Sequence, residues 1–255
     1  MNGLGEAAVT LASEVRRLID GVEGVEVAVC PPYPSLEGVS KVLAGSTVKL
    51  GAQDVFWKDS GAYTGKVSSP MLKAVGCGVV IVGHSECRGR FGKADAEITD
   101  ETILHFGDTD ASVSLKLKAA LKHGLDVILC CGEMLAEREA GNTDQIVGVQ
   151  VQAALHGVST ADLARVTVAY EPVWAIGTGE TCDSAEANRV CGVIRGVIAH
   201  VAGAAVAEQI RIQYGGSVTA DNAAELLSQP EIDGALVGGQ SLKPEAFAKI
   251  VKAAV

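Results

Sequence analysis

The chain of 255 residues is 48% hydrophobic, contains 30 glycines and carries a formal net charge of −10 at pH 7. This composition excludes a disordered chain, and the acidic charge argues against nucleic acid or an anionic membrane surface as a partner. No apolar run reaches the roughly 18 residues of a membrane span, and residues 1–10 do not form a signal peptide. The seven cysteines are scattered without metal-ligand spacing, so we expect reduced thiols, a cytoplasmic location and no membrane partner.

Strand-like and helix-like segments alternate along the chain. Apolar residues at helical spacing predict a helix over 6–19, ahead of the first strand. Short apolar runs predict seven strands, over 25–30, 48–52, 79–82, 127–131, 166–170, 210–214 and 234–237. Further helices are expected over 113–123, 184–200 and 220–227. This alternation is typical of parallel βαβ units, and no linker divides the chain, so we predict a single α/β domain over 1–255.

The segment 169–179 combines a carboxylate with the features of a lid. Glu171 directly follows a predicted strand, and Pro172 after it cannot donate to a sheet. Apolar residues such as Trp174 then lead to Gly177, which permits backbone angles that other residues avoid. A loop with an apolar middle and such ends is able to close over a site and exclude water. The alternative is a buried glutamate that ends a core strand beside an ordinary loop.

Polar residues follow several of the predicted strands. They are His84-Ser85-Glu86, Gly132-Glu133, Glu171, Gly215-Gly216-Ser217 and Gly238-Gly239. The carboxyl ends of the strands of a parallel barrel share one face, so these residues are expected to converge. Backbone N–H groups of glycine loops bind phosphate without a cationic side chain, which suits an acidic protein with an anionic substrate. Taken singly, each signal has a structural alternative: a histidine without a catalytic role, or a glycine in a tight turn.

These motifs, in this order, resemble the triosephosphate isomerase family over nearly the whole chain. The matching segments are Cys30-Pro31-Pro32, Gly51-Ala52-Gln53-Asp54, Gly61-Ala62-Tyr63-Thr64-Gly65, Gly83-His84-Ser85-Glu86, Cys131-Gly132-Glu133, the lid segment 169–179, Tyr214-Gly215-Gly216-Ser217 and Leu236-Val237-Gly238-Gly239. The lid segment and Tyr-Gly-Gly-Ser are specific to that family. The resemblance implies a (β/α)8 TIM barrel.

The same resemblance implies a reaction and roles for the site residues. The reaction is the interconversion of dihydroxyacetone phosphate and D-glyceraldehyde 3-phosphate through an enediolate, a step of glycolysis and gluconeogenesis. Glu171 matches the proton acceptor and His84 the electrophile. Residues that match phosphate-binding positions are Gly177, Ser217, Gly238 and Gly239, and those that match supporting positions are Glu86 and Cys130. No metal or organic cofactor is implied.

A homodimer is also expected. The loop 53–67 contains the aromatic residues Phe56, Trp57 and Tyr63, and an apolar loop that protrudes is typical of an interface. In the family, the matching loop inserts into the partner subunit near its active site, with Thr64 at the tip.

The N-terminus departs from the family pattern. The family opens with a strand that ends in Asn-x-Lys, and the residues after it resemble Met1-Asn2-Gly3. We therefore expect a barrel that lacks about one strand at its N-terminus, and weaker phosphate affinity because the site loses a fixed positive charge. Either the start was assigned too late or the gene encodes a defective relative. The alternative function is a catalytically impaired or non-catalytic homologue that binds triose phosphate.

Two further departures lie elsewhere in the chain. Phe91-Gly92-Lys93-Ala94-Asp95 is echoed fifteen residues later by Phe106-Gly107-Asp108-Thr109-Asp110, so an acidic insertion is expected within 93–110. It is expected to be a solvated surface elaboration, or else a segment that repels anions or contacts the partner subunit. Lys66 and Cys87 stand where the family has Glu and Arg, which pair across its dimer interface, so that ion pair is absent.

Overall fold

The centre of the protein is a sheet of seven parallel strands that pair in chain order in a computed structural model of residues 1–255. The strands are β1 (Ala28–Val29), β2 (Lys49–Ala52), β3 (Val79–Val82), β4 (Asp126–Cys131), β5 (Val166–Tyr170), β6 (Ile212–Tyr214) and β7 (Gly234–Ala235). Each strand is parallel to the next one in the chain. Parallel neighbours need a crossover, and helices supply most of the crossovers here.

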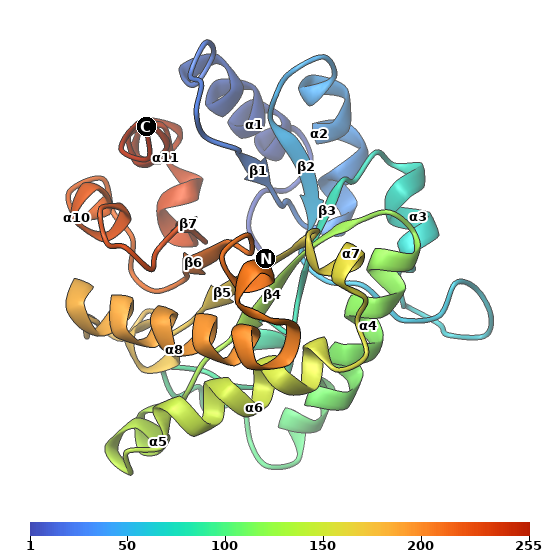
Figure 1. The fold of residues 1–255 in the computed structure, drawn as a ribbon. Coiled ribbons are helices and arrows are strands. Elements are labelled where there is room, and N and C mark those ends of the chain that lie inside the picture. The colour runs from blue at the N-terminus through green and yellow to red at the C-terminus, as the bar shows by residue number, and fades with distance from the viewer.

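The helices form a ring around the sheet (Figure 1). The α-helices are α1 (Glu6–Leu18), α2 (Leu36–Leu43), α3 (Ser69–Ala74), α4 (Asp110–Lys122), α5 (Leu135–Glu139), α6 (Thr143–Leu155), α7 (Thr160–Leu163), α8 (Ser184–Ala202), α9 (Ala204–Ala207), α10 (Ala223–Leu227) and α11 (Pro244–Lys252). Short 3-10 turns are η1 (Tyr33–Ser35), η2 (Ser85–Arg88), η3 (Thr102–His105), η4 (Val173–Ala175) and η5 (Gly239–Leu242). None of the helices is both long enough and apolar enough to span a membrane.

The central strands contribute alternately to two cores. Residues that face the interior of the ring are Val79, Ile81, Ile128, Cys130 and Ala169. Their neighbours in sequence, such as Val80 and Leu129, join a larger core shared with the surrounding helices. This two-residue alternation places the adjacent Cys130 and Cys131 on opposite faces of the sheet, as the sequence predicts. All seven cysteines are free thiols, and burial raises the pKa of each one.

The sheet is open between β1 and β7, whereas the helical layer is continuous there. β1 pairs only with β2 and β7 only with β6. Helix α1 packs against α11 across this gap, and its buried face carries Ala8, Ala12 and Val15. The predicted TIM-type arrangement of seven parallel strands inside a ring of helices is therefore confirmed.

The predicted boundaries are accurate at the centre of the sheet and too long at its edges. β3 and β5 begin and end at the predicted residues. The predictions over 25–30 and 234–237 are wrong in extent, since β1 and β7 have two residues each. Without a second hydrogen-bonding neighbour, the flanking residues of an edge strand leave the extended ladder sooner.

Candidate active site

The backbone on both sides of β5 fixes the position of Glu171. Its N–H donates to the Cys131 carbonyl oxygen at 2.7 Å, and the Gly215 N–H donates to the Tyr170 carbonyl oxygen at 2.7 Å. The ladder with β4 and β6 therefore continues for one residue beyond the strand. Glu171 is only 1% exposed, so a carboxylate stands inside the end of the sheet.

Two glycines make room for this glutamate. A Cβ atom at Gly132 would overlap the backbone carbonyl of Glu171, and one at Gly215 would lie 3.1 Å from Glu171 Cγ. Neighbouring strand ends therefore approach the glutamate more closely than any side chain would permit. These contacts give Gly132 and Gly215 a packing role at the site.

His84 and Glu171 are in direct contact. His84 Nε2 lies 2.9 Å from Glu171 Oε1, and the Ser85 N–H donates to Glu171 Oε2 at 3.0 Å. On the other side of the ring, the Glu86 N–H donates to His84 Nδ1 at 3.2 Å. Because Nδ1 accepts that hydrogen bond, the proton of a neutral imidazole resides on Nε2, where it faces the carboxylate.

The glutamate also governs the protonation of the histidine. Burial lowers the pKa of His84, but the hydrogen bond that His84 donates to Glu171 and the negative charge of that carboxylate outweigh burial and leave this pKa above its ordinary value. The contribution of Glu171 disappears if its carboxylate moves away, and burial then favours the neutral ring. No lysine or arginine forms a hydrogen bond or ion pair with either side chain.

Cys130 and Glu86, the two residues matched to supporting positions, differ in burial and in their contact with the site. Cys130 is fully buried in the inner core, where burial and then the charge of Glu171 raise the pKa of its thiol. The Glu86 side chain is exposed, and its contact with the site is the backbone hydrogen bond to His84.

The first turn of the lid is anchored by a residue to which the sequence assigned no role. Glu133 is fully buried, and its Oε1 accepts hydrogen bonds from Trp174 Nε1 at 2.8 Å and from the Tyr170 hydroxyl at 3.1 Å. The Arg138 guanidinium stacks 4.2 Å from the Trp174 ring. Burial raises the pKa of Glu133, and the hydrogen bonds from Trp174 and Tyr170 oppose that shift. The signals in the sequence were its place two residues after a buried strand and its membership of the matching segment Cys131-Gly132-Glu133, and neither pointed to the lid.

The glycines and the serine matched to phosphate binding lie beyond β5, β6 and β7. All four residues, Gly177, Ser217, Gly238 and Gly239, are exposed. Gly177 has a φ of 69°, which favours glycine, and Gly239 begins η5. Since these strands are parallel and adjacent, the three loops leave the same end of the sheet as Glu171.

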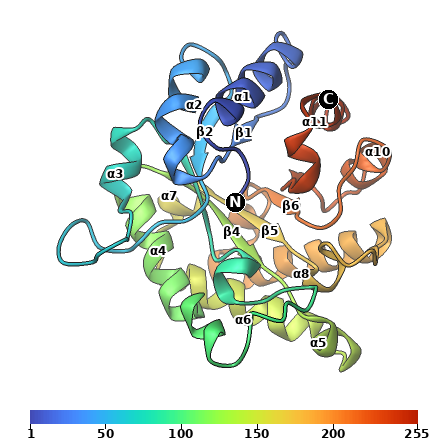
Figure 2. The same cartoon turned by 180° about the vertical axis from the view of Figure 1, so that it is seen from behind.

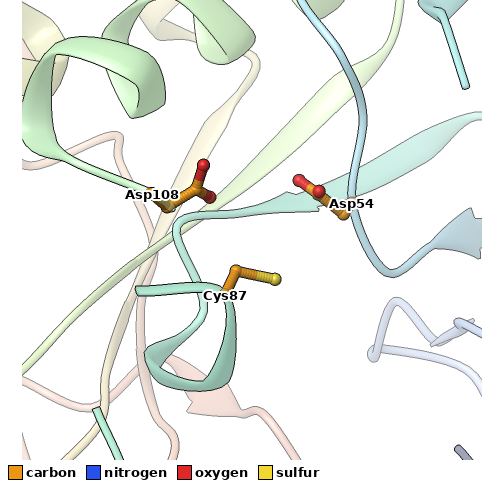
Figure 3. Close-up of side chains that lie close together, drawn as sticks. All are labelled: Asp54, Cys87 and Asp108. Atoms are coloured by element: carbon orange, nitrogen blue, oxygen red, sulfur yellow. The ribbon is translucent and has the colours of Figure 1, made fainter. Parts of the chain in front are cut away.

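A second cluster of acidic and thiol groups lies beside the site, between the end of β2 and the start of α4. Figure 3 shows Asp54, Cys87 and Asp108 converging from three segments, with potential ligand atoms within 4.8 Å of one another. However, the ammonium group of the buried Lys116 lies 2.7 Å from Asp54 Oδ1 and 2.8 Å from Asp108 Oδ1. The lysine supplies the cation, and the cluster is a buried ion-pair network.

The loop 53–67 projects away from the body of the protein in both views (Figures 1 and 2). The Phe56 ring packs 4.0 Å from Trp57 and 5.0 Å from Tyr63, measured between ring centroids. Thr64 is exposed, and the Lys66 ammonium lies 5.8 Å from the centroid of the Phe56 ring. The loop thus presents an aromatic cluster outside the barrel.

A parallel α/β barrel with a buried carboxylate, an imidazole and glycine loops at the carboxyl ends of its strands defines a class of phosphate-binding barrel enzymes. The chain belongs to the triosephosphate isomerase family, since the model of that family, described as "Triosephosphate isomerase", matches residues 1–254.

Relatives of that description are similar over almost their whole length. The triosephosphate isomerase of Moorella thermoacetica is 48% identical over 251 residues, which cover 98% of this chain and 94% of the relative. That of Trichlorobacter lovleyi is 45% identical over 245 residues, which cover 96% of this chain and 92% of the relative. That of Chlorobium luteolum is 47% identical over 250 residues, which cover 98% of this chain and 93% of the relative.

Proposed function

We propose that this chain interconverts dihydroxyacetone phosphate and D-glyceraldehyde 3-phosphate, a step of glycolysis and gluconeogenesis, as the description of its family and relatives indicates. The observation that carries the proposal is the 2.9 Å contact between Glu171 Oε1 and His84 Nε2. A base and a hydrogen-bond donor in contact are the two groups that a proton transfer beside a carbonyl requires.

In the proposed reaction, Glu171 removes a proton from the carbon next to the carbonyl of the substrate. The Nε2–H of His84 donates to the carbonyl oxygen and stabilises the negative charge that develops on it in the enediolate. Protons then move between the two oxygens through His84, and Glu171 returns its proton to the neighbouring carbon. No atom is gained or lost, so the product is an isomer.

The position of Glu171 implies that the carboxylate moves during the reaction. His84 and Ser85 occupy its two oxygens, and the side chain is almost wholly buried. Rotation toward the substrate breaks both hydrogen bonds, and the lid excludes water from the base that is then exposed. Loss of these bonds and of water makes the carboxylate more basic when it meets the substrate.

Phosphate binding is proposed for the backbone of Gly177, Ser217, Gly238 and Gly239. Support comes from their exposure and from their shared end of the sheet. Backbone N–H groups at the start of a helical turn such as η5 favour negative charge. A phosphate held there would lie at the strand ends that also carry Glu171.

The proposal extends to the organisation of the protein. We assign residues 1–255 to one domain, because one large core contains residues from α1 through α11. A homodimer through the loop 53–67, with Tyr63 and Thr64 at the contact, is supported by the projecting aromatic cluster. A cytoplasmic location agrees with seven free thiols.

The test is turnover of D-glyceraldehyde 3-phosphate by the purified chain, compared with Glu171→Gln. Calorimetry with glycerol 3-phosphate, which lacks the reactive carbonyl, measures binding separately. Turnover that is lost in the variant while binding persists supports the proposal. Binding without turnover in the unsubstituted chain contradicts it and supports a non-catalytic triose-phosphate-binding homologue.

A further inference from the structure

The segment 89–107 forms a folded excursion between η2 and α4. Its neck is closed by the Asp108 N–H, which donates to the Cys87 carbonyl oxygen at 3.1 Å. Inside it, the rings of Phe91 and Phe106 meet edge to face with centroids 5.0 Å apart. The two phenylalanines are the matching residues of the sequence echo, so the echo has a structural counterpart in the packing of this segment.

The first residues of this segment contact the end of β4. The Arg90 N–H donates to the Ser85 carbonyl oxygen at 2.9 Å. The Arg90 guanidinium donates to the Gly132 carbonyl oxygen at 3.3 Å and pairs with Glu137 at the start of α5. In Figure 2 the segment, in teal to green, lies on the face of the molecule that includes α5.

Gly92 packs directly against the lid. A Cβ atom at this position would overlap the Val173 carbonyl oxygen and lie 2.7 Å from the Ile176 carbonyl oxygen. It would also lie 3.1 Å from Thr178 Cγ2. Val173 begins η4 and Ile176 follows its end, so Gly92 contacts both ends of the first turn of the lid.

We propose that the segment 89–107 is a brace that positions the lid by holding η4 in place. The brace packs against the carbonyl groups of the turn, while Glu133 holds the Trp174 side chain. Beyond Ile176 the surroundings of Gly92 change from backbone carbonyl groups to the Thr178 methyl group, and Gly177 and Gly179 are exposed with positive φ. Closure is therefore confined to the tip of the lid, and the turn next to Glu171 stays fixed.

The acidic residues of the segment take no part in this contact. Asp95, Glu97, Asp100 and Glu101 are all exposed. The brace acts through the backbone of Gly92 and the side chain of Arg90, so loss of a surface charge leaves its effect intact. The neighbouring exposed Lys93 provides a matched control position.

Trp174 reports on this turn directly. The chain has two tryptophans, and Trp57→Phe leaves Trp174 as the only one. In that background we compare Arg90→Met, Gly92→Ala and the control Lys93→Met. Acrylamide quenching of Trp174 without ligand reports the mobility of η4, and kcat and KM for D-glyceraldehyde 3-phosphate report its effect on closure.

Arg90→Met and Gly92→Ala are expected to raise the quenching constant about twofold and KM about three- to tenfold, with a smaller change in kcat. Lys93→Met leaves all three quantities at the parent values. Unchanged quenching and KM in both brace variants, in folded protein, overturn the proposal. If neither variant folds, deletion of 92–106, which joins Phe91 to Gly107, replaces them with the same two outcomes.

The measurements of kcat and KM rest on the proposed function, whereas the quenching of Trp174 fluorescence does not. A parent that shows no turnover contradicts the isomerase, and quenching still decides whether the brace holds η4. A parent that turns over, with brace variants that match it in quenching and KM, contradicts the brace alone.

Discussion

The centre and the edges of the sheet differ in length, burial and pairing. β4 and β5 have six and five residues, and almost all are buried, whereas β1 and β7 have two partly exposed residues each. The backbone around Glu171 is hydrogen-bonded on both sides, which edge strands cannot match. The difference teaches that this fold places its buried Glu171 carboxylate where two neighbouring strands fix the backbone.

The largest expected effect is on the activity, and it comes from the proposed base Glu171 at the end of the central strand β5. Glu171→Gln keeps the shape of the side chain but removes its ability to accept a proton from carbon. A general base typically contributes 10²–10⁴-fold, so kcat should fall about 10³-fold or more. Steady-state turnover measures the fall. The exposed Glu208, at the end of α9, provides the control Glu208→Gln, and an equal loss there contradicts the assignment.

The next effect tests the buried ion network beside the central strands. Lys116→Met leaves the carboxylates of Asp54 and Asp108 without their shared cation, and loss of one partner of a buried pair costs about 3–5 kcal/mol of unfolding free energy. Urea denaturation measures this loss. Lys122→Met, on the same helix, removes an exposed partner of Asp59 and should cost less than about 1 kcal/mol. Similar losses in both variants contradict a special role for Lys116.

Hydrogen exchange compares the two regions without any substitution. Backbone amides of β4 and β5 are expected to exchange about 10²-fold more slowly than those of β1 and β7, because edge strands open locally at lower free energy. Mass spectrometry of exchanged peptides measures this ratio. Equal protection in the two regions shows that the open side of the sheet is as rigid as its centre.

The smallest expected effect concerns how the unfolding free energy changes with pH, and it arises from Glu133. Because burial raises its pKa in the folded state, the folded protein retains a proton that the unfolded chain releases. The stability that Glu133 contributes is fully present below its pKa in the unfolded chain. It is lost as pH rises through its pKa in the folded protein. Between pH 5 and 8, the unfolding free energy of Glu133→Gln should therefore fall less with rising pH than that of the parent. Parallel curves from urea denaturation contradict this sign.

The difference between central and edge strands also explains which strand boundaries could be predicted from the sequence. β3 and β5 were predicted at the correct residues because continuous β-branched runs mark strands buried on both faces. The prediction for β6, over 210–214, is two residues too long, since the structure begins it at Ile212. Composition does not reveal which strand ends lack a hydrogen-bonding partner.

The convergence of the candidate site residues was predictable where a local motif carries them. Glu171 follows β5 directly and His84 follows β3 after one glycine, and the structure brings the two side chains into contact. Lys116 and the contact of Gly92 with the lid depend on tertiary packing between segments far apart in the chain. A lysine within a helix has no sequence pattern that distinguishes it from a solvated residue, and the Phe-Gly echo that contains Gly92 does not reveal a contact with the lid.

The seven free thiols, five of them buried and two half-buried, have a practical consequence. Because their raised pKa values keep them almost wholly protonated near pH 7, the folded chain offers very little thiolate for alkylation or oxidation. Reagents such as iodoacetamide should therefore modify mainly molecules that open. Cys130 and Cys131, on opposite faces of β4, would report separately on exposure of the interior of the barrel and on detachment of the helical layer.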